Sequence, residues 1–421
     1  MNKLTTDTVF KLKNGIEIFP FDSKLSSNDY LISVENCNYR VSEIIYKITN
    51  LIDGSRSLND ILVKINTDGN NLSEESLIKI FSTYLIPNGI VLGNCEITKR
   101  KTNHLYFKYL ILSKDKLHPI TNILKHIFSK SYVIPIIICL CIFYLYLFIF
   151  ENITSVSLSE LKGSEVVLMY FVIYATIFFH ELGHLSACHY YNIEYKEIGV
   201  GLYLYFLVFY SDVSKTWKLN RKQRIVVDLG GIYFQLISIF FLYILSIIFN
   251  NVAFIYAIYL TILSILFSLN PFFKFDGYWI VSDLMGISNL RKHVYNYLKM
   301  SINNLFKRNI VLCDSDSKNL PKKIKYNFIF YIVLSNLFFA INIIYLFTYF
   351  SFHFNDLYEK FFIGIKDLSN NFIDTNLVDV VNKFNNLFPY LVLFFSFSVI
   401  AIINIKKIID FLIKYNDRTK S

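Results

Sequence analysis

The sequence predicts an all-α polytopic membrane protein with about six transmembrane helices, preceded by a small N-terminal α+β domain. Of its 421 residues, 54% are hydrophobic and 18% are aromatic, which is more than soluble proteins usually contain. Apolar runs of about twenty residues recur between basic loops, and this is the length that a bilayer's hydrocarbon core requires. The first 94 residues contain no such run and instead show short strand and helix patterns.

Residues 1–94, called the front domain below, are expected to fold outside the membrane. Short strand-like runs (VFKL, IEIFPF, YLISVEN) are separated by turn residues. Apolar residues at helical spacing follow over 41–52, with Ser42 as the candidate N-cap. Ser57 and Ser73 are candidate N-caps of two further short helices. GIVL is expected to close the domain as a strand.

The rest of the chain divides into a basic connector (95–130), a membrane core (131–290), and a loop with two C-terminal spans (291–421). The expected spans are 132–150, 166–190, 225–249, 252–270, 327–350 and 388–406. Assigning the basic loops to the cytoplasm gives one consistent topology, with both termini cytoplasmic. The first residues do not have the pattern of a signal peptide, which agrees with a cytoplasmic N-terminus.

One apolar segment is too short to cross a membrane. GVGLYLYFLVFY (199–210) has about a dozen residues. We expect it to form a hairpin or a re-entrant segment whose backbone is covered by protein.

Charge and cysteine usage exclude several kinds of protein. The net charge is +10, but the Lys and Arg residues lie between apolar runs and form no single stripe, so nucleic-acid binding is not expected. The six cysteines contain no CxxC pair, which argues against a disulfide scaffold or a thiolate zinc site. The Asn-, Ile- and Lys-rich composition suggests an AT-rich bacterial genome.

The second expected span contains HELGH, residues 180–184. Residues four apart share a helix face, so His180 and His184 can bind one metal ion. Catalytic zinc sites use imidazole nitrogens and keep one position open for water, and Glu181 stands where a carboxylate can take that water's proton. Ionisable groups inside a membrane cost free energy, which favours a functional role over a chance motif. The alternative is a polar cluster bonded within the helix bundle.

A third ligand is needed, and two residues were considered. His189 is five residues after His184, so it points about 140° away around the helix, and we expect it at the membrane interface. Asp276 is expected to end an apolar helix in SLNPFFKFDGYW, where Asn270 and Pro271 suggest a broken helix that turns a ligand inward. An ordinary Asp-Gly surface turn explains the same pattern equally well.

HELGH followed about ninety residues later by P-x4-D-G resembles the site-2 protease family of intramembrane zinc metalloproteases over about residues 165–290. The resemblance implies zinc as cofactor, His180, His184 and Asp276 as its ligands, and Glu181 as the residue that activates water. Asn270 is an uncertain stand-in for a substrate-contacting asparagine, because the family's asparagine position holds Ser268 here. The family's second glycine after Asp-Gly is Tyr278.

In the front domain, the run VSEIIYKITNLIDGSRSLNDIL (41–62), followed by a helix with an acidic start, resembles the PqqD-like winged-helix modules. These modules recognise peptides in the biosynthesis of ribosomally made, modified peptides. Such modules bind a leader peptide as an added strand, and the alternative is a generic cytoplasmic domain. The combination resembles the peptide zinc metalloproteases encoded beside small precursor peptides of the bacteriocin type. It implies a precursor peptide as partner and leaves a peptide transporter possible.

Two other functions were weighed. A regulated intramembrane protease would cleave a membrane-anchored regulatory protein, and such proteases often carry a PDZ domain that is not expected here. A transporter or immunity protein would predict internal repeats and charges spread over several spans, and the sequence shows neither.

Overall fold

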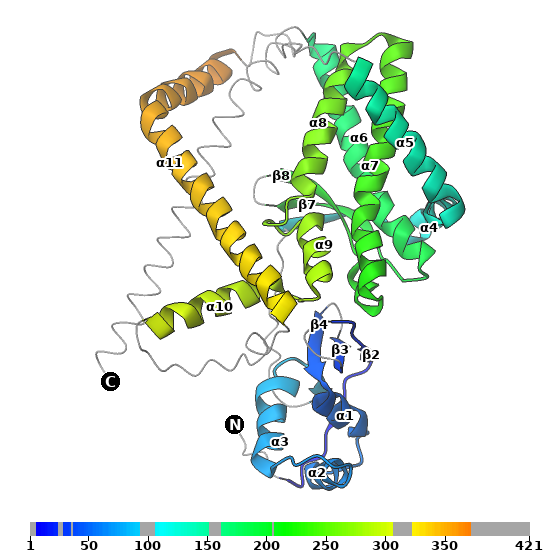
Figure 1. The fold of residues 1–421 in the computed structure, drawn as a ribbon, viewed down its shortest axis with the longest axis vertical. Coiled ribbons are helices and arrows are strands. Elements are labelled where there is room, and N and C mark those ends of the chain that lie inside the picture. The colour runs from blue at the N-terminus through cyan, green and yellow to red at the C-terminus, as the bar shows by residue number, and fades with distance from the viewer. Residues whose placement is uncertain are drawn as a thin grey trace. The chain divides into compact units, whose positions relative to one another are not determined.

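A computed structural model of the protein describes residues 6–23, 28–34, 37–92, 106–150, 161–203, 206–305 and 322–371. In these ranges the chain is mostly helical, with small β-sheets in the front domain (Figure 1). Four helices are long and apolar enough to cross a membrane. The described residues therefore support the expected class of a helical membrane protein through these four candidate spans.

The front domain combines short antiparallel sheets with three α-helices. Its strands are β1 (Lys11–Leu12), β2 (Glu17–Pro20), β3 (Asp29–Val34), β4 (Cys37–Ser42) and β5 (Val91–Leu92), with β1 paired to β5 and the order β2-β3-β4 in the larger sheet. Its helices are α1 (Glu43–Leu51), α2 (Leu58–Thr67) and α3 (Glu74–Ile80). Ile32, Ile48, Ile65 and Phe81 are fully buried in one apolar core.

Two of the three expected helix caps in this domain are confirmed. The Ser57 and Ser73 hydroxyls accept hydrogen bonds from backbone N–H groups of α2 and α3, which confirms both N-caps. Ser42 precedes α1 but makes no side-chain cap bond. Strand β4 was not predicted: Val41, assigned to the following helix, pairs with Tyr30 of β3 instead.

The four candidate spans are α5 (Lys130–Phe150), α6 (Gly163–Tyr190), α7 (Arg221–Phe249) and the Ile324–Asn342 part of α11 (Lys322–Asn371). They agree with four of the six expected spans. The expected span 252–270 is α8 (Val252–Ser268), whose 17 residues are fewer than the roughly twenty needed to cross. The sixth, 388–406, lies outside the described residues.

Helices α6 and α7 pack closely through glycines (Figure 1). A Cβ atom on Gly183 would lie 2.2 Å from the Gly230 carbonyl oxygen. Only residues without a side chain permit this approach. The contact brings the HELGH face of α6 against the middle of α7.

The 199–210 segment forms a β-hairpin, which confirms the expectation. Its strands β7 (Ile198–Tyr203) and β8 (Phe206–Ser211) pair antiparallel, and β6 (Tyr106–Leu112) from the connector joins β7 to give the order β6-β7-β8. Strand β6 was not predicted. Helix α4 (Lys114–Leu124) follows β6, and α9 (Asp276–Met285) and α10 (Leu290–Leu305) follow α8.

Candidate metal centre

Two histidines of α6 face each other across one helical turn. The Nε2 atoms of His180 and His184 lie 3.0 Å apart, and both residues are buried. The i, i+4 spacing on a continuous helix places them on one face, as the sequence predicted. Both Nε2 atoms therefore point toward the same small volume.

Asp276 brings a carboxylate to this volume from a distant part of the chain. Its Oδ2 lies 3.0 Å from His180 Nε2, and its Oδ1 lies 3.6 Å from His184 Nε2. The expectation that Asp276 ends an apolar helix was wrong, because α8 ends at Ser268 and Asp276 is the first residue of α9. The chain turns tightly between the two helices: a Cβ atom on Gly277 would lie 2.1 Å from the Leu269 carbonyl oxygen.

Hydrogen bonds hold the side chains of all three residues. His180 Nδ1 lies 3.0 Å from Gln235 Oε1, and His184 Nδ1 lies 2.8 Å from the Val227 carbonyl oxygen. Acceptors at both Nδ1 atoms favour the tautomer that leaves Nε2 free to bind a metal. The Ser268 hydroxyl donates to Asp276 Oδ2 at 2.7 Å.

The three residues suit a metal ion in chemistry and in space. One ligand atom from each of His180, His184 and Asp276 lies within 4.8 Å of the others. A Cβ atom on Gly231 would lie 2.6 Å from both Nε2 atoms, so the glycine keeps this volume clear of side chain. Two imidazoles and one carboxylate are a ligand set of catalytic zinc, with a fourth position left open.

Glu181 lies beside the same site. A cavity of about 360 Å³ is lined by His180, Glu181 and Asp276, together with residues 208–210 of β8. The Glu181 Oε2 atom accepts a hydrogen bond of 2.6 Å from the Ser211 hydroxyl. The His180 imidazole and the carboxylates of Glu181 and Asp276 thus line one cavity.

The other residues considered lie elsewhere. Asn270 Oδ1 accepts the backbone N–H of Phe272 at 2.9 Å, which stabilises the turn before α9, and its substrate role stays a prediction. His189 Nδ1 lies 3.0 Å from the Thr121 hydroxyl, so this histidine contacts α4 and is not part of the His-His-Asp group.

A buried ion pair joins α7 to α9 near the site. The Arg224 Nη2 atom donates to Asp283 Oδ1 at 2.6 Å, and the side chains are 5% and 12% exposed. Arg224 also donates to the Leu219 carbonyl oxygen at 2.8 Å and to the Asp22 carbonyl oxygen at 3.1 Å. This arginine therefore links the start of α7 to the end of α9 and to Asp22 of the front domain.

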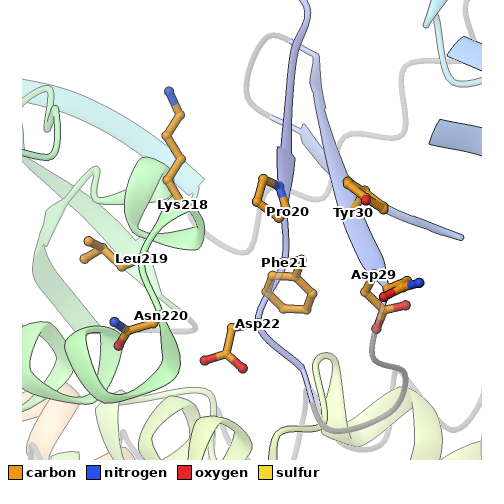
Figure 2. A pocket seen from close by; sticks show the side chains of 9 residues that line it. Pro20, Phe21, Asp22, Asp29, Tyr30, Lys218, Leu219 and Asn220 are labelled. Carbon is orange, nitrogen blue, oxygen red and sulfur yellow. The ribbon is translucent and has the colours of Figure 1, made fainter. Parts of the chain in front are cut away.

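A second cavity, of about 370 Å³, lies where the front domain meets the segment before α7. Figure 2 shows Pro20, Phe21 and Asp22 opposite Lys218, Leu219 and Asn220. Although burial opposes it, hydrogen bonds from Arg221 hold the pKa of Asp22 below its usual range. A hydrogen bond from Lys218 lowers the pKa of Glu17 in the same way. Pairs of opposite charge thus line the contact between the front domain and the segment before α7.

Sequence reasoning found the four residues central to the site but missed their partners. Gln235 is a buried amide in an apolar span, a signal that was available in the sequence. Ser211 and Ser268 carry no local signal, because their contacts depend on the hairpin and on the α8–α9 turn.

Comparison with known proteins gives one distant similarity. A stretch of 134 residues is 26% identical to the Bacillus subtilis (strain 168) protein described as "Putative peptide zinc metalloprotease protein YydH". The stretch covers 31% of this chain and 52% of that protein, so the chain matches about half of its relative's length. No protein-family model matches the chain, and no solved structure matches it.

Proposed function

We propose that this protein is a membrane-embedded zinc metalloendopeptidase that hydrolyses a peptide bond in a small precursor peptide near the cytoplasmic leaflet. The observation that carries the proposal is the convergence of His180, His184 and Asp276 on one point, with Glu181 lining the same cavity. The similarity to a protein named as a peptide zinc metalloprotease supports the same activity.

Each residue has a defined part in the proposed reaction. A zinc ion held by His180, His184 and Asp276 would supply a Lewis acid that polarises the peptide carbonyl and acidifies water. Glu181 accepts the proton of the attacking water and passes it to the leaving amine. Gln235 bonds His180 Nδ1 and Ser268 bonds Asp276 Oδ2, which keeps the ligands oriented.

The substrate is proposed to bind as a strand along β8. This strand is one of the two outer strands of the β6-β7-β8 sheet in the described residues, and its residues 208–210 line the cavity. The free edge of a strand offers backbone donors and acceptors to an extended peptide. Pairing there would place a peptide bond beside Glu181.

The front domain is proposed to recognise the leader of the precursor peptide, with both termini of the protein in the cytoplasm of a bacterial cell. Its three-stranded sheet has β2 and β4 as outer strands, which suits leader binding by strand addition. Its charged contact with the segment before α7, including the 2.8 Å Glu17–Lys218 pair, would keep the recognised peptide near the hydrolytic site. A peptide transporter is a further possible partner.

Two other functions compete with this one. A regulated intramembrane protease would use the same site on a membrane-anchored regulatory protein, so only the substrate separates it from our proposal. A transporter or immunity protein would use the histidines without hydrolysis. Its activity would survive the Glu181→Gln substitution better than a protease's would.

The test is cleavage by the purified full-length protein in lipid nanodiscs. The substrates are synthetic peptides with the sequences of small precursor peptides sought in the genome next to the gene, and products are identified by mass spectrometry. We expect one cleavage site, with loss of cleavage after zinc chelation and recovery on adding zinc back. An uncleaved peptide beside a zinc-loaded protein would contradict the proposal.

A further inference from the structure

Glu181 is bonded to a strand that belongs to a different part of the fold. The Ser211 hydroxyl donates to Glu181 Oε2 at 2.6 Å, and Ser211 is the last residue of β8. We propose that Ser211 is a positioning residue that orients the Glu181 carboxylate and ties it to the strand along which the substrate binds. This inference rests on the proposed hydrolytic function.

The backbone of Ser211 is held firmly. Ser211 pairs with Ile198 of β7, and Ile198 is fully buried in the apolar core beneath the hairpin. The pairing continues beyond the strand: Lys196 N–H donates to the Asp212 carbonyl oxygen, and Asp212 N–H donates to the Glu197 carbonyl oxygen, both at 3.2 Å. The register of the hairpin therefore sets where the Ser211 hydroxyl lies.

Glu181 needs a hydrogen-bond partner that fixes the conformation of its side chain. Helix α6 fixes only its Cα atom, and the side chain has several staggered conformations to choose from. A charge-assisted hydrogen bond to one carboxylate oxygen selects one of them. Because Ser211 binds Oε2, the other oxygen, Oε1, stays available to receive a proton from water.

Strand β8 lies beside both the substrate cavity and Glu181. Residues 208–210 line the cavity that Glu181, His180 and Asp276 share, and Ser211 follows directly. A peptide paired along β8 would therefore be positioned by the same strand that holds the Glu181 carboxylate. Small errors of position at a reacting centre can cost about 100-fold in rate. Holding the substrate and Glu181 on one strand would keep such errors small.

A purely structural role for Ser211 makes different predictions. If the hydroxyl only stabilised the hairpin, its loss would weaken substrate binding or folding and would raise KM. If it orients Glu181, its loss would lower kcat while KM and zinc content stay the same. Measuring kcat and KM separately therefore distinguishes the two roles.

The experiment compares Ser211→Ala, Ser211→Thr and Ser211→Val in the full-length protein, using the synthetic precursor peptide described above. Threonine and valine have nearly the same shape, but only threonine keeps the hydroxyl. We expect kcat to fall about 10- to 100-fold in Ser211→Ala and Ser211→Val, since a hydrogen bond to a charged group is lost. Ser211→Thr should recover most of kcat, and KM should change less than about twofold in all three.

Ser214→Ala is the matched control. The Ser214 hydroxyl also donates to a carboxylate, that of Asp212, but in an exposed turn. We expect its kcat to equal that of the wild type. The zinc content of every variant should remain that of the wild type.

Equal kcat in Ser211→Thr and Ser211→Val, or a change confined to KM, would overturn this inference alone. A wild-type protein that binds zinc but cleaves nothing would overturn the proposed function and this inference with it. Wild-type cleavage that is lost in Ser211→Val and retained in Ser211→Thr would support both.

Discussion

The His180 Nε2 atom lies 3.0 Å from Asp276 Oδ2, although His180 belongs to the long candidate span α6 and Asp276 begins the short helix α9. His184 Nε2 lies 3.0 Å from His180 Nε2 and 3.6 Å from Asp276 Oδ1. Without an ion these groups would be a costly polar cluster in an apolar helix bundle. A metal ion at this point would offset that cost and would explain why the three are brought together.

Replacing Glu181 with glutamine tests the proton-transfer step. The amide keeps the shape of the side chain and can still accept the Ser211 hydrogen bond, but it cannot take a proton from water. We expect kcat to fall about 100- to 10,000-fold with zinc content unchanged. Peptide cleavage and zinc analysis on the same sample check this, and full activity in Glu181→Gln would exclude Glu181 as the base.

Gln235 is expected to control metal affinity without binding the metal. Gln235→Leu removes the acceptor 3.0 Å from His180 Nδ1, so the imidazole loses its preferred tautomer and orientation. Losing such a partner typically weakens metal binding about 10- to 100-fold. Competition with a fluorescent zinc chelator measures the affinity.

Gln223→Leu is the control for this substitution, because Gln223 lies in the first turn of α7 and caps the helix through Asn220. Its zinc affinity should match the wild type. Equal affinities in Gln235→Leu and Gln223→Leu would show that Gln235 does not support the site.

Gly231→Ala should remove the metal while leaving most of the fold intact. The added methyl group would lie 2.6 Å from the Nε2 atoms of His180 and His184, where the ion would be bound. We expect zinc to be lost and the thermal unfolding temperature of the zinc-free protein to change little. Ser238→Ala on the same helix, whose hydroxyl bonds only the Phe234 carbonyl oxygen in the described residues, should retain zinc. Zinc at the wild-type level in Gly231→Ala would contradict the assignment.

The Arg224–Asp283 ion pair is expected to stabilise the fold around the site. Arg224→Met leaves the buried Asp283 carboxylate without its partner, which typically costs about 3–5 kcal/mol. The double variant Arg224→Met/Asp283→Leu should be destabilised much less, because no buried charge remains. Unfolding in detergent measured by circular dichroism checks both.

Lys47→Met provides the comparison, since its pair with Glu43 is 3.1 Å long and exposed on α1. Exposed pairs contribute about 0–1 kcal/mol. A similar loss of stability in Lys47→Met and Arg224→Met would mean that burial does not set the strength of the Arg224 pair.

The sequence predicted the elements whose patterns are local. Long apolar runs identified α5, α6, α7 and the start of α11, and serines before apolar periodicity identified the starts of α2 and α3. The HELGH spacing was enough to place two histidines on one face. These features depend on residues within one or two helical turns of each other.

Features that depend on distant pairing were missed. Strand β4 forms because Val41 and its neighbours pair with β3, which overrides their helical spacing. Strand β6 joins the β7–β8 hairpin from the connector, and no pattern in the connector signals this partner. Ser211 and Ser268 acquire their contacts only when separate elements meet, so no local spacing could have indicated them.

The most direct test of the central claim is zinc content, measured by plasma mass spectrometry on purified wild type, His180→Ala and Asp276→Ala, with peptide cleavage on the same samples. The account predicts about one zinc ion per chain in the wild type and loss of both zinc and cleavage in the two variants. Full zinc content in Asp276→Ala would remove this residue as a ligand. A wild-type protein that binds no zinc would contradict the metalloprotease and favour a transporter or immunity function.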